Sequence, residues 1–401
     1  MTLRVLVSAY ACEPNRGSEP GVGWNWVRQI ARRHQTWVIT RCNNRPAIEA
    51  ELARNPLPGA HFIYYDLPRW ARFWKRRRRG LYLYYYLWQL GAYFQARRLH
   101  AEIRFDVAQH ATFVMYWMPS FLALLPIPFI WGPVGGGEST PRAFLPALGR
   151  RGKLIEFLRA AAQGMGRLDP FVRLTARRSA IAFATTRETE ERLKQIGCRE
   201  TAVLPVMGMN TAEIDELANS SASVHPHFRV ATLGNLLAWK GVEFGIRAFS
   251  EIQRRYPDSE YWIVGDGPER QRCTELAPAR VRFFGALPRA EALAKLAECD
   301  VLLLPSLHDS GSCVCTEAMA IGRPVVCLDL GGPGLQVTAE TGIKVAAHSP
   351  GQVVADLAAA LQTLASDSAL RRRMGQAGQA RVRELYNWDR KELDWAGVCR
   401  A

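Results

Sequence analysis

A short apolar run followed by a Gly-containing loop and an Ala-rich segment is the feature that most limits how this chain can fold. The run is Val301 to Leu304, and the next segment, Pro305 to Gly334, reads PSLHDSGSCVCTEAMAIGRPVVCLDLGGPG. This order predicts a buried strand, a loop and a helix. Such a loop directs backbone N–H groups toward a ligand, and the positive end of the helix dipole lies behind it. We therefore expect an anion-binding loop here.

Two carboxylates flank this loop. Asp309 lies at its start, and Glu317 follows eight residues later inside the predicted helix. Side chains on a helix point back toward its N-terminus, so Glu317 is expected to face the same ligand as Asp309. Because an ionised carboxylate only accepts hydrogen bonds, we expect its partners to be sugar or ribose hydroxyls.

The segment resembles the signature of the retaining glycosyltransferases of GT-B fold, family 4, also called glycosyl transferases group 1. The residues that match it are Pro305, Ser306, Asp309, Gly311, Glu317, Ala318, Met319, Ala320, Gly322, Pro324 and Val325. Two residues depart from it, since Asp309 stands where the family usually has Glu and Ser312 where it usually has Gly. An ordinary Ala-rich surface helix after a buried strand is the structural alternative.

The resemblance implies an α/β chain of GT-B type, with two Rossmann-like domains that face each other across a cleft. The length of 401 residues and the recurring strand-and-helix rhythm fit two domains. We place the acceptor-binding domain at residues 1–207 and the nucleotide-sugar-binding domain at 208–385. Residues 386–401 are expected to cross back to the first domain. The stretch 208–228, enriched in Asn, Ser, His and Pro, is the expected hinge.

The donor site is expected in the second domain. The family pattern G-R-x-x-x-x-K-G places a lysine on the donor diphosphate, and Lys240 falls on it, whereas Asn235 stands where relatives commonly have Arg. A lysine there can stabilise the leaving diphosphate, and the structural alternative is an ordinary surface lysine at a helix start. The other residues to which the resemblance gives donor contacts are Gly17, Gly265, Leu287, Asp309, Ser310, Gly311, Ser312 and Glu317.

Two Gly-rich stretches in the first half are candidate acceptor-binding loops. They are CEPNRGSEPGVGWNW, with Gly21 and Gly23, and GPVGGGE, with Gly135 and Gly136. A tight turn before a helix explains the first stretch without a ligand. His110 matches a histidine that family members carry beside the donor sugar. We name it as a catalytic candidate with Lys240 and Asp309, although a lone histidine can also be structural.

The formal net charge of +15 implies an acidic partner. Nine Arg or Lys residues and ten aromatic residues, but no acid, lie between Arg69 and Ala101. This composition suits an anionic membrane surface, with Lys75, Arg76, Arg77, Arg78 and Arg79 facing the lipid. It also suits single-stranded nucleic acid, or a core helix beside a solvated basic turn. Within a glycosyltransferase we favour the membrane and expect no nucleic acid.

The remaining composition favours a cytoplasmic enzyme, and with the basic stretch we expect it to be peripheral at the inner face of the plasma membrane. Nine scattered cysteines indicate reduced thiols, and Cys313 and Cys315 alone do not make a metal site. No signal peptide or transmembrane helix is expected. The function predicted is transfer of a hexosyl unit from a nucleotide diphosphate sugar to a glycan or lipid-linked acceptor, with retention and without a metal or other cofactor. The alternatives are a basic, aromatic-rich nucleic-acid-binding protein and an inactive GT-B subunit, the latter because of Asn235 and Ser312.

Overall fold

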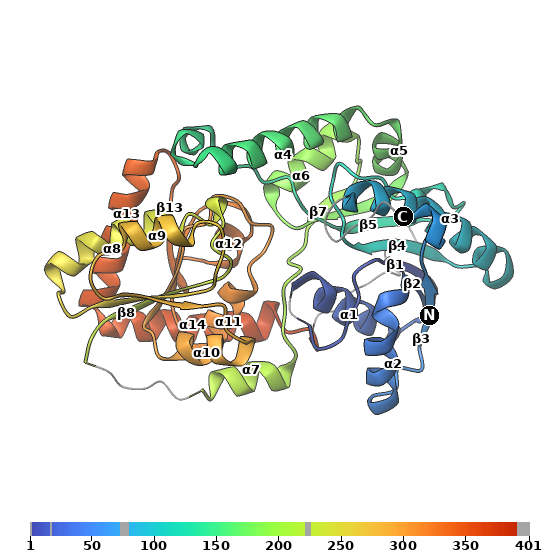
Figure 1. Ribbon diagram of the computed structural model, residues 1–401. Coiled ribbons are helices and arrows are strands. Elements are labelled where there is room, and N and C mark those ends of the chain that lie inside the picture. The colour runs from blue at the N-terminus through green and yellow to red at the C-terminus, as the bar shows by residue number, and fades with distance from the viewer. Residues whose placement is uncertain (1, 17, 73–79, 221–225, 391–401) are drawn as a thin grey trace. The chain divides into compact units, whose positions relative to one another are not determined.

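The computed structural model describes residues 2–16, 18–72, 80–220 and 226–390 of the chain (Figure 1). The chain divides into two compact units. The first unit comprises Met1–Gly137 and Ala160–Val206, and the second comprises Glu138–Arg159 and Met207–Arg390. The second unit therefore includes a segment that precedes the last strands of the first unit in sequence.

The first unit is built on a parallel sheet of seven strands in the order β3-β2-β1-β4-β5-β6-β7 (Figure 1). The strands are β1 (Arg4–Ala9), β2 (Gln35–Arg41), β3 (Ala60–Tyr65), β4 (Val107–Thr112), β5 (Phe129–Val134), β6 (Ser179–Ala184) and β7 (Thr201–Val203). Its helices are α1 (Ser18–Ala31), α2 (Arg45–Arg54), α3 (Leu81–Ile103), α5 (Pro170–Arg178) and α6 (Arg187–Ile196), with single 3-10 turns η1 (Cys42–Asn44), η2 (Arg69–Ala71) and η3 (Phe121–Leu124). This confirms the predicted α/β rhythm, because each expected strand is present within a few residues.

The second unit is built on a parallel sheet of six strands in the order β10-β9-β8-β11-β12-β13. The strands are β8 (Arg229–Leu233), β9 (Glu260–Val264), β10 (Val281–Gly285), β11 (Val301–Leu304), β12 (Val325–Leu328) and β13 (Gly342–Val345). The helices are α7 (Thr211–Ala218), α8 (Val242–Arg255), α9 (Arg270–Leu276), α10 (Arg289–Ala297), α11 (Cys313–Ile321), α12 (Gly331–Gln336), α13 (Pro350–Ser366) and α14 (Ser368–Leu385), with 3-10 turns η4 (Arg142–Ala147) and η5 (Ala238–Lys240). Both units thus have the Rossmann-like topology of the predicted GT-B fold.

Alternation along the strands of the second unit divides its core into two layers. Leu303 of β11 packs with α8 and α13 on one face of the sheet, whereas Leu302 and Leu304 pack with α11 and α14 on the other. Successive side chains of a strand point to opposite faces, so continuously apolar strands require helices on both. The buried run Val301–Leu304 has the bounds expected from its sequence.

Two stretches expected to be irregular contain helices, and the hinge role of 208–228 stays a prediction. The predicted hinge at 208–228 contains helix α7, which buries Ile214 and Leu217 in the core of the second unit. The first Gly-rich stretch is not a loop up to Gly23, because α1 begins at Ser18 and contains both Gly21 and Gly23. In each case the Gly, Asn or Pro content suggested a loop, but packing against the sheet decided the structure.

The basic, aromatic stretch contains the long helix α3, which presents two different faces. One face is buried in the core of the first unit by Tyr84, Tyr85, Trp88 and Ala92. The other face leaves Tyr82, Leu83, Leu90 and Phe94 exposed. The core-helix alternative is therefore correct for one face of α3. The basic cluster from Lys75 to Arg79 lies outside the described residues.

Among the described helices, none is by itself long and apolar enough to cross a membrane. The bent pair α13 and α14 meets the length and composition criteria only when both helices are taken together.

Candidate functional site

Lys240 and Asp309 form an ion pair between two loops of the second unit. Lys240 ends η5, which follows β8, and Asp309 follows β11. These strands are neighbours at the place where the strand order of the sheet reverses. Ligands of open α/β sheets bind outside the carboxyl ends of strands at such a switch point. The two predicted catalytic residues therefore meet where the topology favours a ligand.

The backbone after Lys240 approaches the Asp309 loop closely. Gly241 has φ +62°, and a Cβ atom there would lie 2.1 Å from the carbonyl oxygen of Pro305. Any residue with a side chain would push the two loops apart, so Gly241 permits the pairing of Lys240 with Asp309.

The predicted anion loop is held from beneath by α12. Only glycine fits at position 331, because a Cβ atom there would lie 2.4 Å from the carbonyl oxygen of Asp309. The backbone N–H of Gly332 donates to that same oxygen at 2.7 Å. A Cβ on Gly332 would in turn lie 2.5 Å from the Cα of Gly311. Gly331 and Gly332 thus allow the start of α12 to pack directly against the backbone of the loop from Asp309 to Gly311.

Ser312 has a structural place that accounts for its departure from the family pattern. Its hydroxyl caps α11 by accepting from the N–H of Cys315 at 3.4 Å. Its own N–H donates to Oε1 of Gln336 at 3.0 Å, and Nε2 of Gln336 donates to its carbonyl at 2.9 Å. These contacts give Ser312 a structural role as a helix cap, and its predicted contact with the donor stays a prediction.

Glu317 is buried on α11 and paired with a cation. Nε of Arg289 donates to Oε1 of Glu317 at 2.8 Å, and a second nitrogen of Arg289 also bonds Glu213 at 2.5 Å. Burial raises the pKa of Glu317, and the Arg289 guanidinium opposes that shift. The two Arg289 nitrogens that contact Glu317 both meet its Oε1. The Oε2 atom of Glu317 can therefore accept a hydrogen bond from a ligand hydroxyl.

The segment Glu138–Arg159 supplies further polar side chains to the same loop of the second unit. The Ser310 hydroxyl donates to Glu138 Oε2 at 2.8 Å, and Arg159 donates to the Glu138 carbonyl at 2.9 Å. Nε2 of His308 lies 3.0 Å from Glu156 Oε1, with both side chains buried. These acids were not named as site residues from the sequence, because more than 150 positions separate Glu156 and Glu138 from their partners.

A ring stack runs alongside the Lys240–Asp309 pair. The indole of Trp239 stacks on the imidazole of His308, with centroids 5.4 Å apart and planes 14° from parallel. The N–H of Leu307 also donates to the Trp239 carbonyl at 2.8 Å. Because Trp239 precedes Lys240 and His308 precedes Asp309, the stack and the ion pair fix the same two loops side by side.

The other predicted donor residues also follow strands of this sheet. Asn235 is exposed after β8. Gly265 follows β9 with φ +141°, and a Cβ there would lie 1.9 Å from the carbonyl oxygen of Gly234. Leu287 follows β10 and packs against the core. The structure thus collects these residues at the carboxyl edge of one sheet. Gly17 lies outside the described residues.

His110 lies in the first unit at the corresponding switch point between β1 and β4. It is buried in β4, where Nε2 lies 2.8 Å from the Tyr85 hydroxyl and 3.0 Å from Nε2 of Gln89. Desolvation lowers the pKa of His110 to about 3. A neutral ring enclosed by α3 and β4 agrees with the structural alternative, and the predicted catalytic role of His110 stays a prediction.

The glycines proposed as acceptor residues are explained locally by close packing. A Cβ on Gly23 would lie 2.1 Å from the Ala11 carbonyl oxygen, and one on Gly21 would lie 1.9 Å from that of Arg16. Gly136 has φ +90° and faces Trp117, and the N–H of Gly135 donates to the Val114 carbonyl at 2.9 Å. Steric need therefore accounts for Gly21, Gly23 and Gly136, and the predicted contact of all four glycines with an acceptor stays a prediction.

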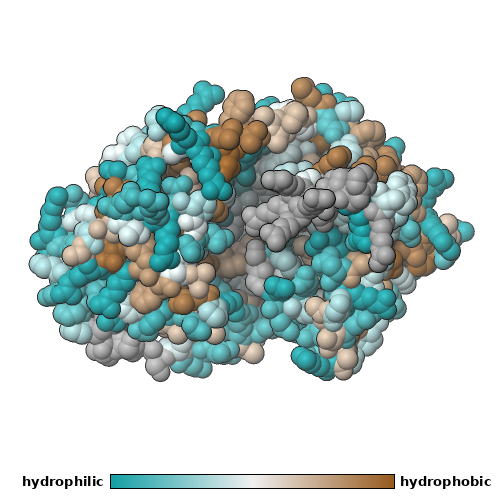
Figure 2. Space-filling model, in the orientation of Figure 1, coloured by the Kyte–Doolittle hydropathy of each residue, from teal (hydrophilic) through white to brown (hydrophobic). Residues whose placement is uncertain are grey.

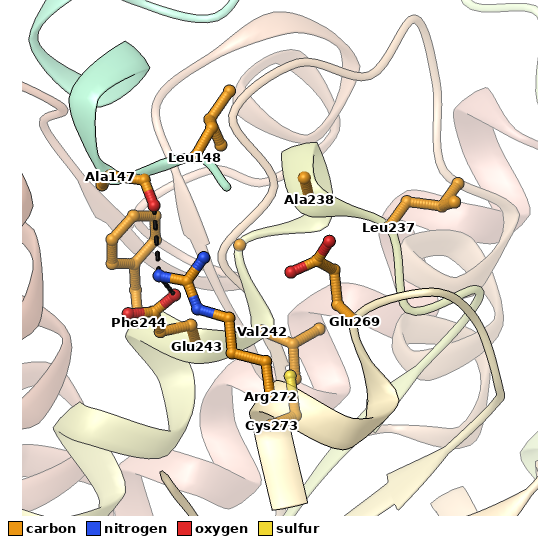
Figure 3. A pocket seen from close by; sticks show the side chains of 11 residues that line it. Ala147, Leu148, Leu237, Ala238, Val242, Glu243, Phe244, Glu269, Arg272 and Cys273 are labelled. Carbon is orange, nitrogen blue, oxygen red and sulfur yellow. Dashed lines mark hydrogen bonds and ion pairs between the residues drawn. The ribbon is translucent and has the colours of Figure 1, made fainter. Parts of the chain in front are cut away.

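A pocket of the second unit opens where η4 packs on α8 and α9 (Figure 3). Arg272 points into it, donating to the Ala147 carbonyl at 3.2 Å and pairing with Glu243 at 2.6 Å. Glu269 also lines it. Two carboxylates beside an arginine that already pairs with Glu243 would repel a diphosphate, so the predicted donor site stays at the Lys240 edge of the sheet. Within the described ranges, no three His, Cys, Asp or Glu side chains group as a metal site.

Comparison with known proteins agrees with this location. Residues 227–367, which contain Lys240, Asp309 and Glu317, match the family model described as glycosyl transferases group 1. A glycogen synthase of Mycobacterium tuberculosis is 32% identical over 162 residues, which cover 39% of this chain and 38% of that protein. The chain spans less than half of the length of the curated relatives it matches.

Solved structures resemble the whole chain rather than one unit. Sucrose-phosphate synthase from Thermosynechococcus elongatus has a TM-score of 0.62 at 17% identity, covering 99% of this chain and 96% of that one. Anabaena HepE, solved with UDP and glucose, has a TM-score of 0.58 at 15% identity, covering 99% and 97%. These likenesses confirm the GT-B fold.

The burial of His110 generates a prediction about stability. An unfolded chain protonates this histidine below its ordinary pKa of 6.5, whereas the folded protein resists protonation down to about 3. The contribution of neutral His110 is therefore fully present above pH 6.5 and is lost, by about 1.4 kcal/mol per pH unit, as pH falls from 6.5 toward 3. Urea unfolding of wild type and His110→Gln at several pH values should show this slope in the difference between their free energies of unfolding. Parallel pH dependences would contradict a buried neutral histidine.

Proposed function

Residues 227–367 belong to the glycosyl transferases group 1 family, and on that premise we propose that the chain is a retaining glycosyltransferase. It would move a hexosyl unit from a nucleotide diphosphate sugar to a glycan or lipid-linked acceptor. The observation that carries the proposal is the pairing of Lys240 with Asp309 at the switch point of the second sheet. HepE, of the same fold, was solved with UDP and glucose, which supports a nucleotide sugar as donor.

The proposed chemistry needs a cation where the diphosphate leaves. The bond between the anomeric carbon and the diphosphate oxygen breaks, and negative charge accumulates on the diphosphate. A bond from the acceptor oxygen to the same carbon forms with retention, and the leaving phosphate takes the acceptor proton. Lys240 can release Asp309 and stabilise the diphosphate as its charge grows. Asp309 is then available to sugar hydroxyls. This division of roles needs no metal.

Glu317 is proposed to hold the donor ribose. It is buried on α11, the helix that follows the loop from Asp309, and Arg289 fixes its orientation through Oε1. A buried carboxylate held this way is preorganised to accept a ribose hydroxyl hydrogen bond. Burial raises the pKa of Glu317. As pH falls, ribose binding should therefore weaken at a higher pH than it would with an ordinary carboxyl group.

The proposed acceptor is reached at a membrane surface. The acidic partner implied by the net charge of +15 is proposed to be an anionic membrane surface, bound by the cluster from Lys75 to Arg79. A lipid-linked acceptor would then be presented to the enzyme at the cytoplasmic face. Exposed Tyr82, Leu83 and Phe94 on the following helix support this proposal, because such residues favour the interface of a bilayer.

The proposal predicts selective stabilisation by nucleotides. Thermal unfolding in the presence of UDP, GDP and a panel of their sugar conjugates should show a raised Tm for one base, because a ligand that binds only the folded state stabilises it. The preferred sugar conjugate should also be hydrolysed slowly. Binding of RNA or DNA without any nucleotide effect would favour the nucleic-acid alternative, and nucleotide binding without turnover would favour an inactive subunit.

Glu317→Ala should weaken binding of the preferred nucleotide. Losing a charged hydrogen-bond partner in a buried site costs about 2–3 kcal/mol, equivalent to roughly 30- to 150-fold in Kd. Titration calorimetry measures this directly. Glu213→Ala is the matched control, because Glu213 shares Arg289 with Glu317 without being assigned to the ribose. Equal losses in both variants would mean that Glu317 acts only through Arg289.

Lys240→Ala should lower kcat by about 100-fold or more, with a smaller change in donor KM, because charge on the diphosphate is greatest in the transition state. Lys344→Ala is the control, since Lys344 also pairs with a carboxylate after a strand, Asp329, at 2.9 Å. Steady-state kinetics with the preferred donor separate the two constants. A rise in KM alone would show that Lys240 binds ground state and transition state equally.

A further inference from the structure

Helix α4 (Arg150–Leu168) buries a side made of Gly152, Glu156, Gln163 and Gly166 and exposes its large apolar side chains. Leu154, Leu158, Ala161, Met165 and Leu168 recur at intervals of four and three residues, which places them along one side of a helix. All five are exposed, and Leu158, Met165 and Leu168 are 57%, 68% and 76% exposed. We call this side the α4 apolar stripe. Surface helices of globular proteins have the opposite arrangement.

Specific contacts explain why the polar side of α4 is the buried one. In the part of the helix that belongs to the second unit, Glu156 bonds His308. In the part that belongs to the first unit, Nε2 of Gln163 donates to the Gly136 carbonyl at 2.9 Å. A Cβ on Gly166 would lie 2.2 Å from the Cβ of Trp117. The helix is therefore oriented by polar partners and close backbone packing, and its apolar stripe is directed outward.

Neighbouring residues enlarge the apolar surface. Phe157 is 69% exposed on α4, and Phe171, at the start of α5, is 45% exposed. Phe171 packs edge-on against Phe121, with centroids 5.4 Å apart, which fixes its position. Figure 2 shows hydrophobic side chains on the part of the surface where Figure 1 places α4. Exposed apolar side chains grouped along one helix in this way mark an interaction site.

The charges around the stripe indicate the kind of partner. Residues 150–178, all of which the structure describes, contain eight Arg or Lys and two acids. Both acids are engaged within the protein, Glu156 with His308 and Asp169 with the N–H of Phe171 and the Tyr86 hydroxyl. Seven of the cations are exposed, namely Arg150, Arg151, Lys153, Arg167, Arg173, Arg177 and Arg178. The surface therefore presents apolar groups bordered by positive charge.

We propose that the α4 apolar stripe, with Phe157 and Phe171, inserts into the surface of an anionic lipid bilayer. An apolar helix face of Leu, Met and Phe bordered by Arg and Lys is the composition of helices that lie in a membrane interface. A second copy of the chain would bring the same cations against one another, which disfavours self-association. This inference deepens the membrane association proposed above, and it assigns the apolar part of that association to α4 and α5.

Salt separates the two contributions to membrane binding. Attraction of basic residues to anionic lipid weakens as the Debye length falls from about 10 Å at 0.1 M to about 3 Å at 1 M salt. Insertion of apolar side chains does not weaken in this way. Wild-type protein should therefore sediment with phosphatidylglycerol–phosphatidylcholine vesicles at low salt, and a measurable fraction should remain bound at high salt.

The variant Leu158→Ser/Met165→Ser/Leu168→Ser tests the stripe. Its three positions are each more than half exposed, so folding should be retained, as circular dichroism and Tm can verify. Its partition coefficient at 1 M salt should fall at least about tenfold, because each lost side chain removes apolar burial. The control Leu276→Ser/Leu385→Ser removes exposed leucines of the second unit, 36% and 40% exposed, and should behave as wild type. If the triple variant has a lowered Tm, Leu168→Ser alone is used.

Each remaining outcome separates this inference from the proposed function. Wild type that binds at low salt and is fully released at high salt leaves the basic cluster as the only membrane contact and overturns the stripe. Equal sedimentation of the triple variant and wild type also overturns it. Light scattering that shows a wild-type dimer and a monomeric triple variant would also overturn insertion of the stripe into lipid, because the stripe would then be an interface between copies of the chain. Nucleotide-induced thermal shifts of wild type test the glycosyltransferase proposal independently of vesicles.

Discussion

The ion pair between Lys240 and Asp309 depends on the strand order of the second sheet. Their loops lie 69 residues apart in sequence and become neighbours because β8 and β11 pair where the order reverses. Connections on either side of this point leave in opposite directions, so the two loops have room to diverge and admit a ligand. Gly241, Gly331 and Gly332 then let the loop backbones approach closely enough for the side chains to meet. Most of the candidate site follows from this one topological feature.

Buried charge is the second constraint, because an ionised group removed from water needs a partner. Glu317 meets Arg289, and Glu156 meets His308. Arg289 comes from α10. Glu156 comes from the segment Glu138–Arg159, which belongs to the second unit but precedes the rest of that unit in sequence. The same segment brings Glu138 to Ser310. Side chains that reach the donor loop from several directions hold its conformation before any ligand binds, which lowers the ordering cost of binding.

The same requirement for partners governs where apolar surface is exposed. On α4, the groups that need hydrogen bonds face the protein, and the leucines and Met165 that need none face outward. On α3, Tyr85 and Trp88 complete the core of the first unit, while Leu83 and Phe94 do not. Both helices combine a structural face with an exposed apolar one. A protein whose net charge is +15 can present such faces to an anionic surface without self-associating readily.

The sequence by itself determined the strand-and-helix rhythm and the GT-B fold class, and it singled out the loop after β11 as the candidate donor loop. Apolar runs such as Val301–Leu304 report burial locally, and the motif around Asp309 and Glu317 lies within one strand, loop and helix. Only the tertiary structure decided that Ser312 caps a helix, that His110 is enclosed and neutral, and that Gly23 serves packing. It also supplied Arg289, Glu138 and Glu156 as partners. The physical reason is that periodicity describes one element at a time, whereas contacts between distant elements follow from how the whole sheet is ordered and packed.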